Sequence, residues 1–424
     1  MQVNKYLSGL AKLETPPVGN QPSGGASISK HIGNASAAKS GVVLSINSAS
    51  NIPASPMTIS KFLANITKFS SPVQILDTAA NIAKNLGTLK NLSVPNLAKI
   101  DTIEQQGTAQ NIAITYDQWL DSDAQEVLAK LVDGSNIFAV KNVPDQYLSD
   151  VQGDTNVQSI GVIDVDKADL ADRLTDMQTS RISTVGVIDV AYTDLTDPDS
   201  DYFADLKNRA VTSIGVLDVP GANLATVLSN SKVKTVTVTD VLAKDALKVG
   251  AKAQVTSFEV ADSSANLATN FNGLLAQRNK ITAVYQGAPA EVMDLTGAQY
   301  KVARTAGNLL SKFDTDYTVN LTNVRASDYS TLAADDQVVQ VDVLDSGVNI
   351  ARNFDALNDP GTFDKINNII QSGSKDLISI SASQFAGGGD LLDKIQGAYT
   401  LAITDATYAQ LSSLSLTSNT KIRS

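Results

Sequence analysis

The stretch at residues 159–164, Ser-Ile-Gly-Val-Ile-Asp, decides the fold because it returns along the chain with little change. Alternate positions are apolar, which is typical of a strand with one buried face, and an Asp closes each copy. The five clearest copies are residues 159–164, 184–189, 213–218, 235–240 and 257–262. They start 25, 29, 22 and 22 residues apart, a spacing typical of repeat arrays. Parallel strands need a crossover of about a dozen residues, so each interval has room for one short helix.

A second signature follows three of the strand-closing aspartates. It reads Asp-x-x-(Ala/Val)-Asn-(Ile/Leu)-Ala-x-Asn-(Leu/Phe) at residues 77–86, 262–271 and 345–354. Its recurring polar residues are Asp77, Asn81, Asp262, Asn266, Asp345 and Asn349. We expect the aspartates to cap the helix that follows, and the asparagines to satisfy backbone groups of an adjacent coil. The alternatives are a calcium ladder for the aspartates, including the equivalents at 164, 189, 218, 240 and 405, and a ligand site for the asparagines.

Together these patterns predict an α/β fold, a strand–helix repeat solenoid with a parallel sheet on one side and short helices on the other. Its architecture resembles that of leucine-rich repeats, although their consensus is absent. Regular repeats are predicted over 71–310, and less regular repeats and a tail over 311–424. In the later part we expect a longer composite unit, in which two further strands and a second helix follow the Asp-x-x-x-Asn helix. Residues 1–70 are rich in Pro, Gly, Ser and Asn and predict an irregular arm, with an edge strand at 42–46 and a short helix at 59–66.

Composition and charge exclude several classes of site and partner. The 424 residues include no Cys, which rules out disulfides and thiolate sites, and one His, His31, in a segment that reads as loop. The net charge of −11 disfavours nucleic acids and anionic membranes as partners. No apolar run is long enough to span a membrane. The arm differs from the rest, since residues 1–70 hold six Lys and one Glu, a net charge of +5.

Two features are candidates for binding. Four aspartates surround Pro198 within the longest of the short repeats, and they are the best local candidates for calcium: Asp194, Asp197, Asp199 and Asp201. The alternative is a solvated acidic loop. Trp119, the single Trp, could grip a sugar if exposed, but we expect it to pack where irregular repeats give way to regular ones. No phosphate loop, nucleophile elbow or metal-spaced His/Glu pair is present, so we predict no catalytic residue and no cofactor other than calcium.

The motif Asp-Thr-Ala-Ala-Asn-Ile-Ala at residues 77–83 is similar to repeats of large type I secreted bacterial surface proteins, a group that includes adhesins, matrix proteins and surface-layer proteins. The stretch 394–405, Lys-Ile-Gln-Gly-Ala-Tyr-Thr-Leu-Ala-Ile-Thr-Asp, is also typical of them. The resemblance covers about residues 71–405 and implies a scaffold rather than an activity. Calcium-binding nonapeptide repeats, which are frequent in that group, are missing here. Residues 387–390 are the single stretch that resembles them, and the resemblance is weak.

These observations lead to a non-enzymatic extracellular structural protein as the expected function. We expect it to assemble with itself into a filament, sheath or surface layer, with the basic arm docking on the next copy. The alternative is a monomeric adhesin or matrix protein that binds cell-surface glycans or proteins through the solenoid face. A glycan-cleaving enzyme is a third hypothesis. Residues 1–11 lack the apolar run of a cleavable signal, and the Leu/Ser/Thr-rich tail at 404–424 resembles uncleaved type I signals as well as ordinary tails.

Overall fold

The computed structural model describes residues 55–132, 134–305, 308–314, 316–373 and 377–409. Its strands pair in parallel and form four sheets, of two, eight, four and two strands. The predicted α/β class and parallel pairing are therefore confirmed. One continuous sheet is not found, because some segments contribute a single bridging residue instead of a strand, as Phe313 does beside Val284 and Ile395 beside Ile369.

The described residues divide into two compact units, one within 55–162 with 181–183 and the other within 163–180 with 184–409. The three predicted segments do not coincide with these units, and their limits remain predictions. The predicted edge strand at 42–46 lies outside the described residues. The end of the predicted arm, from residue 55, belongs to the first unit, where helix α1 (Ile59–Asn65) forms close to the predicted position and Met57 bridges to Ile75.

The first unit holds the two-stranded sheet and the first strands of the eight-stranded sheet. Its strands are β1 (Val73–Asp77), β2 (Ile100–Gln105), β3 (Ile112–Thr115) and β4 (Phe138–Pro144). Strands β5 (Val157–Asp166) and β6 (Ile182–Ala191) carry residues of both units. Besides α1 its helical segments are η2 (Ile66–Lys68), α2 (Ala79–Lys90), α3 (Val94–Leu97), α4 (Tyr116–Leu120), α5 (Ser122–Leu128), η3 (Asp145–Tyr147) and α6 (Leu148–Gln152).

The second unit continues the same alternation of strand and short helix. The remaining strands of its eight-stranded sheet are β7 (Val211–Pro220), β8 (Val233–Val241), β9 (Val255–Asp262) and β10 (Ile281–Gln286). The four-stranded sheet holds β11 (Met293–Thr296), β12 (Val319–Val324), β13 (Val338–Asp345) and β14 (Ile366–Gln371), and the last sheet holds β15 (Ile378–Ser381) and β16 (Leu401–Thr404). We call each strand, with the helical segment that follows it, a coil.

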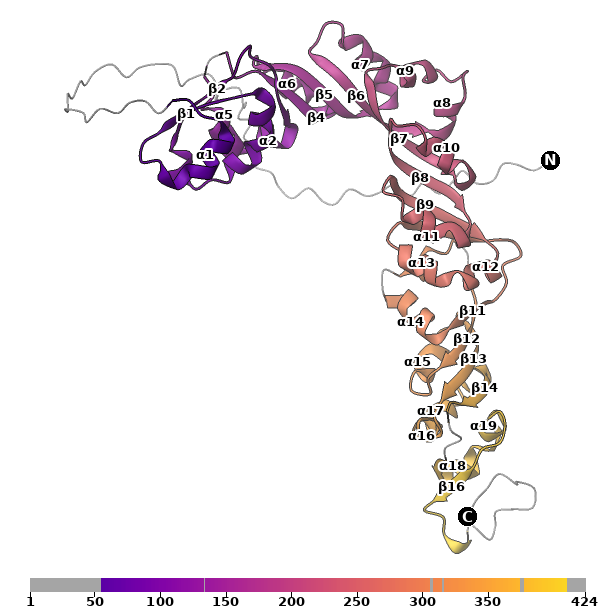
Figure 1. Cartoon of the computed structure of the whole chain (residues 1–424). Helices are drawn as coiled ribbons and strands as arrows, with labels where there is room; N and C mark the ends of the chain where they lie inside the picture. The colour runs from indigo at the N-terminus through magenta and orange to yellow at the C-terminus, as the bar shows by residue number, and fades with distance from the viewer. Residues whose placement is uncertain (1–54, 133, 306–307, 315, 374–376, 410–424) are drawn as a thin grey trace, which may run out of the picture. The chain divides into compact units, whose positions relative to one another are not determined.

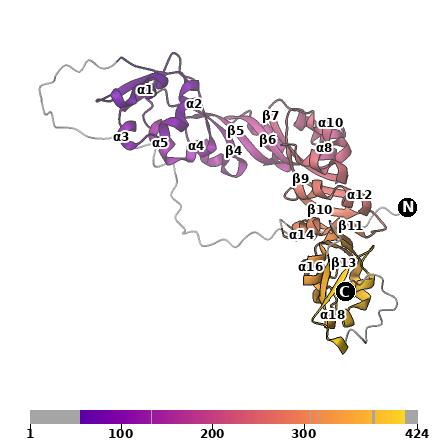
Figure 2. The same ribbon diagram turned by 60° about the horizontal axis from the view of Figure 1, so that its bottom comes forward.

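Helical segments follow the strands of the second unit with few exceptions. Those of its eight-stranded sheet are η4 (Lys167–Asp169), α7 (Leu170–Asp176), α8 (Tyr192–Thr196), α9 (Phe203–Lys207), η5 (Gly221–Asn223), α10 (Leu224–Leu228), η6 (Ala243–Asp245), α11 (Ala246–Gly250), α12 (Ser264–Thr269) and α13 (Phe271–Gln277). The later ones are α14 (Gly297–Thr305), η7 (Leu309–Lys312), α15 (Tyr329–Ala333), α16 (Gly347–Arg352), α17 (Phe354–Leu357), η8 (Phe363–Lys365), α18 (Ala382–Gly387) and α19 (Gly389–Asp393). Helix α10 packs on β7 and β8, and α11 on β9 (Figure 1). Figure 2 shows α8 and α10 from a second direction, again on one side of β6 and β7.

Glycine at the centre of the repeated strand is required by close packing. A Cβ atom on Gly186 would lie 2.3 Å from the Ser213 Oγ of the next strand, and one on Gly215 would lie 2.9 Å from the Thr235 Oγ1. The hydroxyl side chain of each strand therefore covers the glycine of the strand before it. The flanking Val185 and Val187 are buried on the helix side, as the alternation predicts.

Each of these strands also carries a bulge that staggers the sheet. Val187 pairs with Ile214 and Val190 with Val216, so Ile188 and Asp189 stand opposite a single residue. Gly186 pairs with Ser213, two residues before its own equivalent, Gly215. The same offset returns at the next two strand pairs of the second unit, where β7 meets β8 and β8 meets β9.

The structure also contains a composite unit of four strands and one bridging residue, present three times. Its copies run β1–β2–β3–Leu131–β4, β9–β10–β11–Phe313–β12 and β13–β14–β15–Ile395–β16. The predicted composite unit had one polar strand before its second helix and final strand, whereas the structure has two, at β14 and β15 in the third copy. A strand of only four residues, such as β15, gives too little alternation to be separated from its neighbour in the sequence.

Candidate functional site

The three recurring aspartates make the same hydrogen bonds. The Oδ1 atom of Asp345 accepts from the backbone N–H of Ser346 at 2.8 Å and from the Nδ2 of Asn349 at 2.7 Å. Its Oδ2 accepts from the backbone N–H of Ala326, in the preceding coil, at 3.0 Å. Equivalent bonds join Asp77 to Thr78, Asn81 and Ile59, and Asp262 to Ser263, Asn266 and Ala243. Each carboxylate thus fastens its own helix start to the coil before it.

These bonds differ from the predicted cap. The residue after each aspartate occupies the N-cap position: Thr78, Ser263 and Ser346 each accept the backbone N–H of the motif asparagine. A hydroxyl already fills the position that we assigned to the carboxylate, so the carboxylate reaches the preceding coil instead. The motif asparagines were expected to bond to backbone groups of an adjacent coil, but their Nδ2 atoms donate to the carboxylate of their own coil.

Hydrogen bonds favour the ionised form of the Asp262 carboxylate. Burial acts to raise the pKa of Asp262. Hydrogen bonds from Asn266 and from the backbone N–H groups of Ser263 and Ala243 outweigh burial and hold that pKa below its usual range. The ionised form is therefore the one that the network holds.

The other repeated aspartates have a different conformation and a different role. Asp164, Asp189, Asp218 and Asp240 have φ angles of 59°, 57°, 55° and 54°, in the left-handed region. Asn142, Asn323 and Asp405 share this conformation. Asp and Asn tolerate it better than most residues, and at Asp189, Asp218, Asp240 and Asn323 they lie in the bulge of the strand. The predicted helix cap is therefore wrong at the four aspartates, because the strand continues past them into a buried Val, for example Val190 after Asp189.

A set of basic residues, which we did not predict, ties the opposite end of each coil. A Lys or Arg stands directly before a strand or bridging residue and donates to backbone carbonyls of the preceding coil, either at the end of that coil or at the first residue of its strand. The eight residues are Lys99, Lys130, Arg181, Lys232, Lys280, Lys312, Lys365 and Lys394. The Nζ of Lys232, for example, lies 3.1 Å from the Leu206 oxygen and 2.7 Å from the Asn208 oxygen. We call these bonds and the aspartate bonds to the preceding coil the inter-coil ties.

The two kinds of tie complement the electrostatics of a helix. Its free N–H groups carry partial positive charge and its free carbonyls partial negative charge, so a carboxylate suits one end and an ammonium the other. Burial lowers the pKa of Lys232 and of Lys312. The signal in the sequence is a doublet of Lys or Arg with an apolar residue, such as Lys280–Ile281 or Lys365–Ile366.

The calcium candidates do not converge on one point. Asp194 accepts from the Lys167 Nζ at 2.6 Å, from its own helix start and from the Ser200 hydroxyl. Asp197 accepts a backbone N–H from Asp199 within its own turn, and Asp201 is exposed. Among the residues that the structure describes, no group of three or more Asp, Glu, His or Cys side chains could hold a metal ion.

Trp119 and His31 are the two single residues that the sequence draws attention to. Trp119 is buried, with its ring 6.0 Å from that of Tyr116 and its Nε1 donating to the Asp154 carboxylate at 3.4 Å. That is the predicted packing role rather than an exposed sugar platform. His31 lies outside the described residues.

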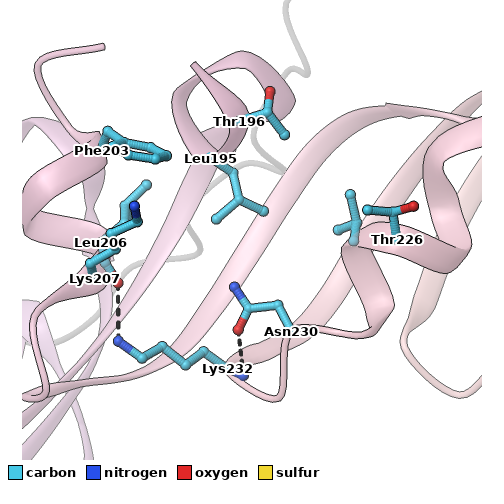
Figure 3. Close-up of a pocket in the computed structure, with 9 residues that line it drawn as sticks. Leu195, Thr196, Phe203, Leu206, Lys207, Thr226, Asn230 and Lys232 are labelled. Atoms are coloured by element: carbon cyan, nitrogen blue, oxygen red, sulfur yellow. Dashed lines mark hydrogen bonds between the residues drawn. The ribbon is translucent and has the colours of Figure 1, made fainter. Parts of the chain in front are cut away.

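Two grooves open on the helix side of the second unit, on either side of α10. One, of about 390 Å³, is lined by α8, α9 and α10. Figure 3 shows Phe203 and Leu206 on one side of it and Thr226 on the other, with Lys232 and Asn230 between them. The other groove, of about 800 Å³, lies between α10 and α11 and is lined by Leu224, Leu228 and Val249 among other residues. Both are mainly apolar and could hold a partner's side chains.

Comparison of the chain with protein-family models, with curated proteins and with solved structures gives no match. Within the described ranges, no helix has both the length and the apolar character needed to cross a bilayer.

Proposed function

We propose that this chain is a non-enzymatic structural protein whose coils stack as a strand–helix solenoid and whose copies associate with one another. The observation that carries the proposal is the repetition of the inter-coil ties. Three of the recurring aspartates and eight basic residues bond to the neighbouring coil, as Asp345 does toward Ala326 and Lys365 toward Asp335. A repeat whose polar signature is used for fastening is suited to maintaining a shape.

The resemblance to type I secreted surface proteins supports an extracellular place for this scaffold. It rests on the motif at residues 77–83 and on the stretch at 394–405. Arrays of this kind associate through surfaces that repeat along their length, and a head-to-tail contact that does not close generates a filament. We therefore propose a filament, sheath or layer at a bacterial surface.

Light scattering coupled to size exclusion, followed by electron microscopy, tests this function directly. The purified chain should form assemblies whose mass rises with protein concentration, and ordered polymers should be visible on the grid. Repeating both measurements with calcium and with a chelator tests separately whether calcium, the one cofactor that the sequence leaves open, takes part in the assembly. A monodisperse monomer throughout the concentration range would overturn the proposal.

The basic arm gives a second test of the same function. Deletion of residues 1–50 removes four of the six arm lysines and should leave a folded protein that polymerises poorly. Circular dichroism checks that the shortened chain is folded. Normal polymerisation of this chain would remove the arm from the mechanism and leave the self-association to other surfaces.

A monomeric adhesin is the second candidate, and the two grooves beside α10 favour it. Apolar hollows of about 390 and 800 Å³ are large enough for side chains of a bound protein or for part of a glycan. A stable monomer that is retained on a glycan or matrix-protein array would favour this function over assembly.

A further inference from the structure

Residues 207–252 carry a charge opposite to that of the whole chain. They contain seven Lys and Arg and three Asp, a net charge of +4, within a chain of net charge −11. The seven basic residues are Lys207, Arg209, Lys232, Lys234, Lys244, Lys248 and Lys252. Of these, Lys232 is used in an inter-coil tie, whereas the other six are exposed. This segment therefore presents positive charge to solvent.

The larger groove lies within this basic segment. Lys248 and Lys252 line it together with Asp240, Asp245 and the apolar side chains of α10 and α11. Leu242 in its lining is 43% exposed, and Leu247 in α11 is 52% exposed. Large apolar side chains left open beside mobile positive charges are the usual make-up of a protein-binding surface with a charged rim.

The coils at residues 353–405 have the complementary character. They contain seven Asp and three Lys, a net charge of −4. Their two described lysines, Lys365 and Lys394, are used in inter-coil ties. Six of the aspartates are described, and all six are exposed: Asp355, Asp359, Asp364, Asp390, Asp393 and Asp405. Ile370 and Leu377, in the same coils, are 42% and 45% exposed.

The two segments are separated within one chain. Strands that are neighbours in the sheets of the second unit are also neighbours in sequence, and β10 to β13 come between β9 and β14 in that order. Opposite charges at distant positions of a sequential stack can meet when two copies lie against each other with an offset.

We propose that the groove between α10 and α11 of one copy receives the described part of the acidic coils, residues 353–373 and 377–405, of a second copy. This inference rests on the self-association proposed above and gives it two defined surfaces. Opposite charge steers the approach, and the exposed apolar side chains of both segments fill the contact. Because the two surfaces differ, a pair of copies still has one surface of each kind unused, and the contact propagates.

Charge reversal on each surface tests the pairing. The first variant is Lys248→Glu with Lys252→Glu, and the second is Asp364→Lys with Asp393→Lys. Each variant alone opposes like charges across the contact, so its apparent dissociation constant should rise by about tenfold or more in sedimentation velocity at low salt. An equimolar mixture should associate as the wild type does, because each reversed surface then finds its reversed partner.

Controls separate this contact from general charge effects and from misfolding. Lys84→Glu with Lys141→Glu makes the same change of charge at exposed positions of α2 and β4, outside the basic arm, and should associate normally. Circular dichroism of each variant should match that of the wild type, and restoration by mixing itself requires both variants to be folded.

The outcomes distinguish the two levels of the proposal. A wild type that stays monomeric at low salt would overturn the self-association as a whole. A wild type that associates while either reversed variant associates equally well would overturn only this contact. So would a mixture that fails to restore association, since it would mean that the two surfaces are not partners.

Discussion

The carboxylate of Asp345 holds the backbone N–H of Ala326, 19 residues earlier in the chain, at 3.0 Å. A single side chain thereby connects the start of α16 with the coil that contains α15. The same connection exists at Asp77 and at Asp262. These bonds make the stability of each coil depend on the one before it.

Replacement of Asp345 by Ala should therefore destabilise two coils at once. The change leaves the N–H groups of Ala326 and Ser346 and the amide of Asn349 without their acceptor, at a cost on the order of 3 kcal/mol. Hydrogen exchange should quicken over residues 319–357, on both sides of the substitution. Asp336→Ala, at an exposed neighbouring position, is the control and should change little. Quickening confined to α16 would contradict the inter-coil role.

Truncation of a tie lysine should cost stability, whereas truncation of a neighbouring lysine should not. Lys232→Ala leaves the carbonyls of Leu206 and Asn208 without this donor and should lower the free energy of unfolding by about 1–3 kcal/mol. Lys234→Ala is the matched control, because its Nζ bonds only to its own turn at Ser231. Urea denaturation followed by circular dichroism measures both, and equal effects would mean that the ties contribute nothing specific.

The covered glycine gives a test of strand packing. Gly186→Ala places a Cβ atom against the Ser213 hydroxyl and should cost about 1–3 kcal/mol. Adding Ser213→Gly removes the obstructing side chain and should recover part of the loss. Gly387→Ala, with nothing within 4 Å of the new atom, should be neutral or slightly stabilising. Thermal unfolding ranks the four proteins, and a lack of recovery in the double variant would argue against this contact.

The left-handed residues should tolerate Gly but not a β-branched side chain. At Asp189, with φ of 57°, substitution by Gly should change stability little, whereas Val should cost about 1–2 kcal/mol. Val at Thr184, in the same strand, supplies the control for the added side chain. Equal stability of the Gly and Val variants, measured by urea denaturation, would show that the left-handed bulge is not retained in solution.

Lowering the pH should stabilise the folded protein through protonation of Glu259. Burial, and then the nearby Asp218, Asp240 and Asp314, raise the pKa of Glu259 above its usual value of 4.5. The folded protein therefore holds that proton more tightly than the unfolded chain, and the penalty of the ionised form is relieved as pH falls through the folded pKa. Glu259→Gln should raise the urea midpoint at pH 7.

The advantage of that variant should fade as the pH is lowered toward 4.5. Glu126→Gln, at an exposed position of α5, removes one carboxylate without this environment and should behave as the wild type. A Glu259→Gln variant with the same midpoint as the wild type at every pH would show that the surrounding carboxylates do not affect Glu259.

Much of this fold follows from local patterns, as the strand at residues 184–189 illustrates. Its alternation and its closing Asp predict a half-buried parallel strand, and β6 is one. The prediction treats all the repeated aspartates alike, as helix caps. The residue that follows each aspartate distinguishes two kinds. Thr78 or Ser263 follows a carboxylate that reaches the preceding coil, whereas Val190 or Val219 follows a left-handed one.

The inter-coil ties were the least predictable part of the candidate site. A lysine such as Lys280 looks like surface charge in a sequence, because its partners are backbone carbonyls that only the stacking of coils brings near. Strand β15 has only four residues, too few for an alternation of apolar and polar residues to be recognised in the sequence. Contacts between coils depend on register, and register follows from bulges that the sequence marks only by single aspartates.

The direction of the inter-coil ties has a consequence for how such a chain can change in length during evolution. Every tie links a residue to the coil before it, so copying or excising one entire coil leaves each donor facing an acceptor of the same kind. Excision of only part of a coil would instead leave a carboxylate or an ammonium without its hydrogen-bond partner. Length can therefore change in fixed steps, through duplication and loss of whole modules, while the chemistry at each junction stays the same.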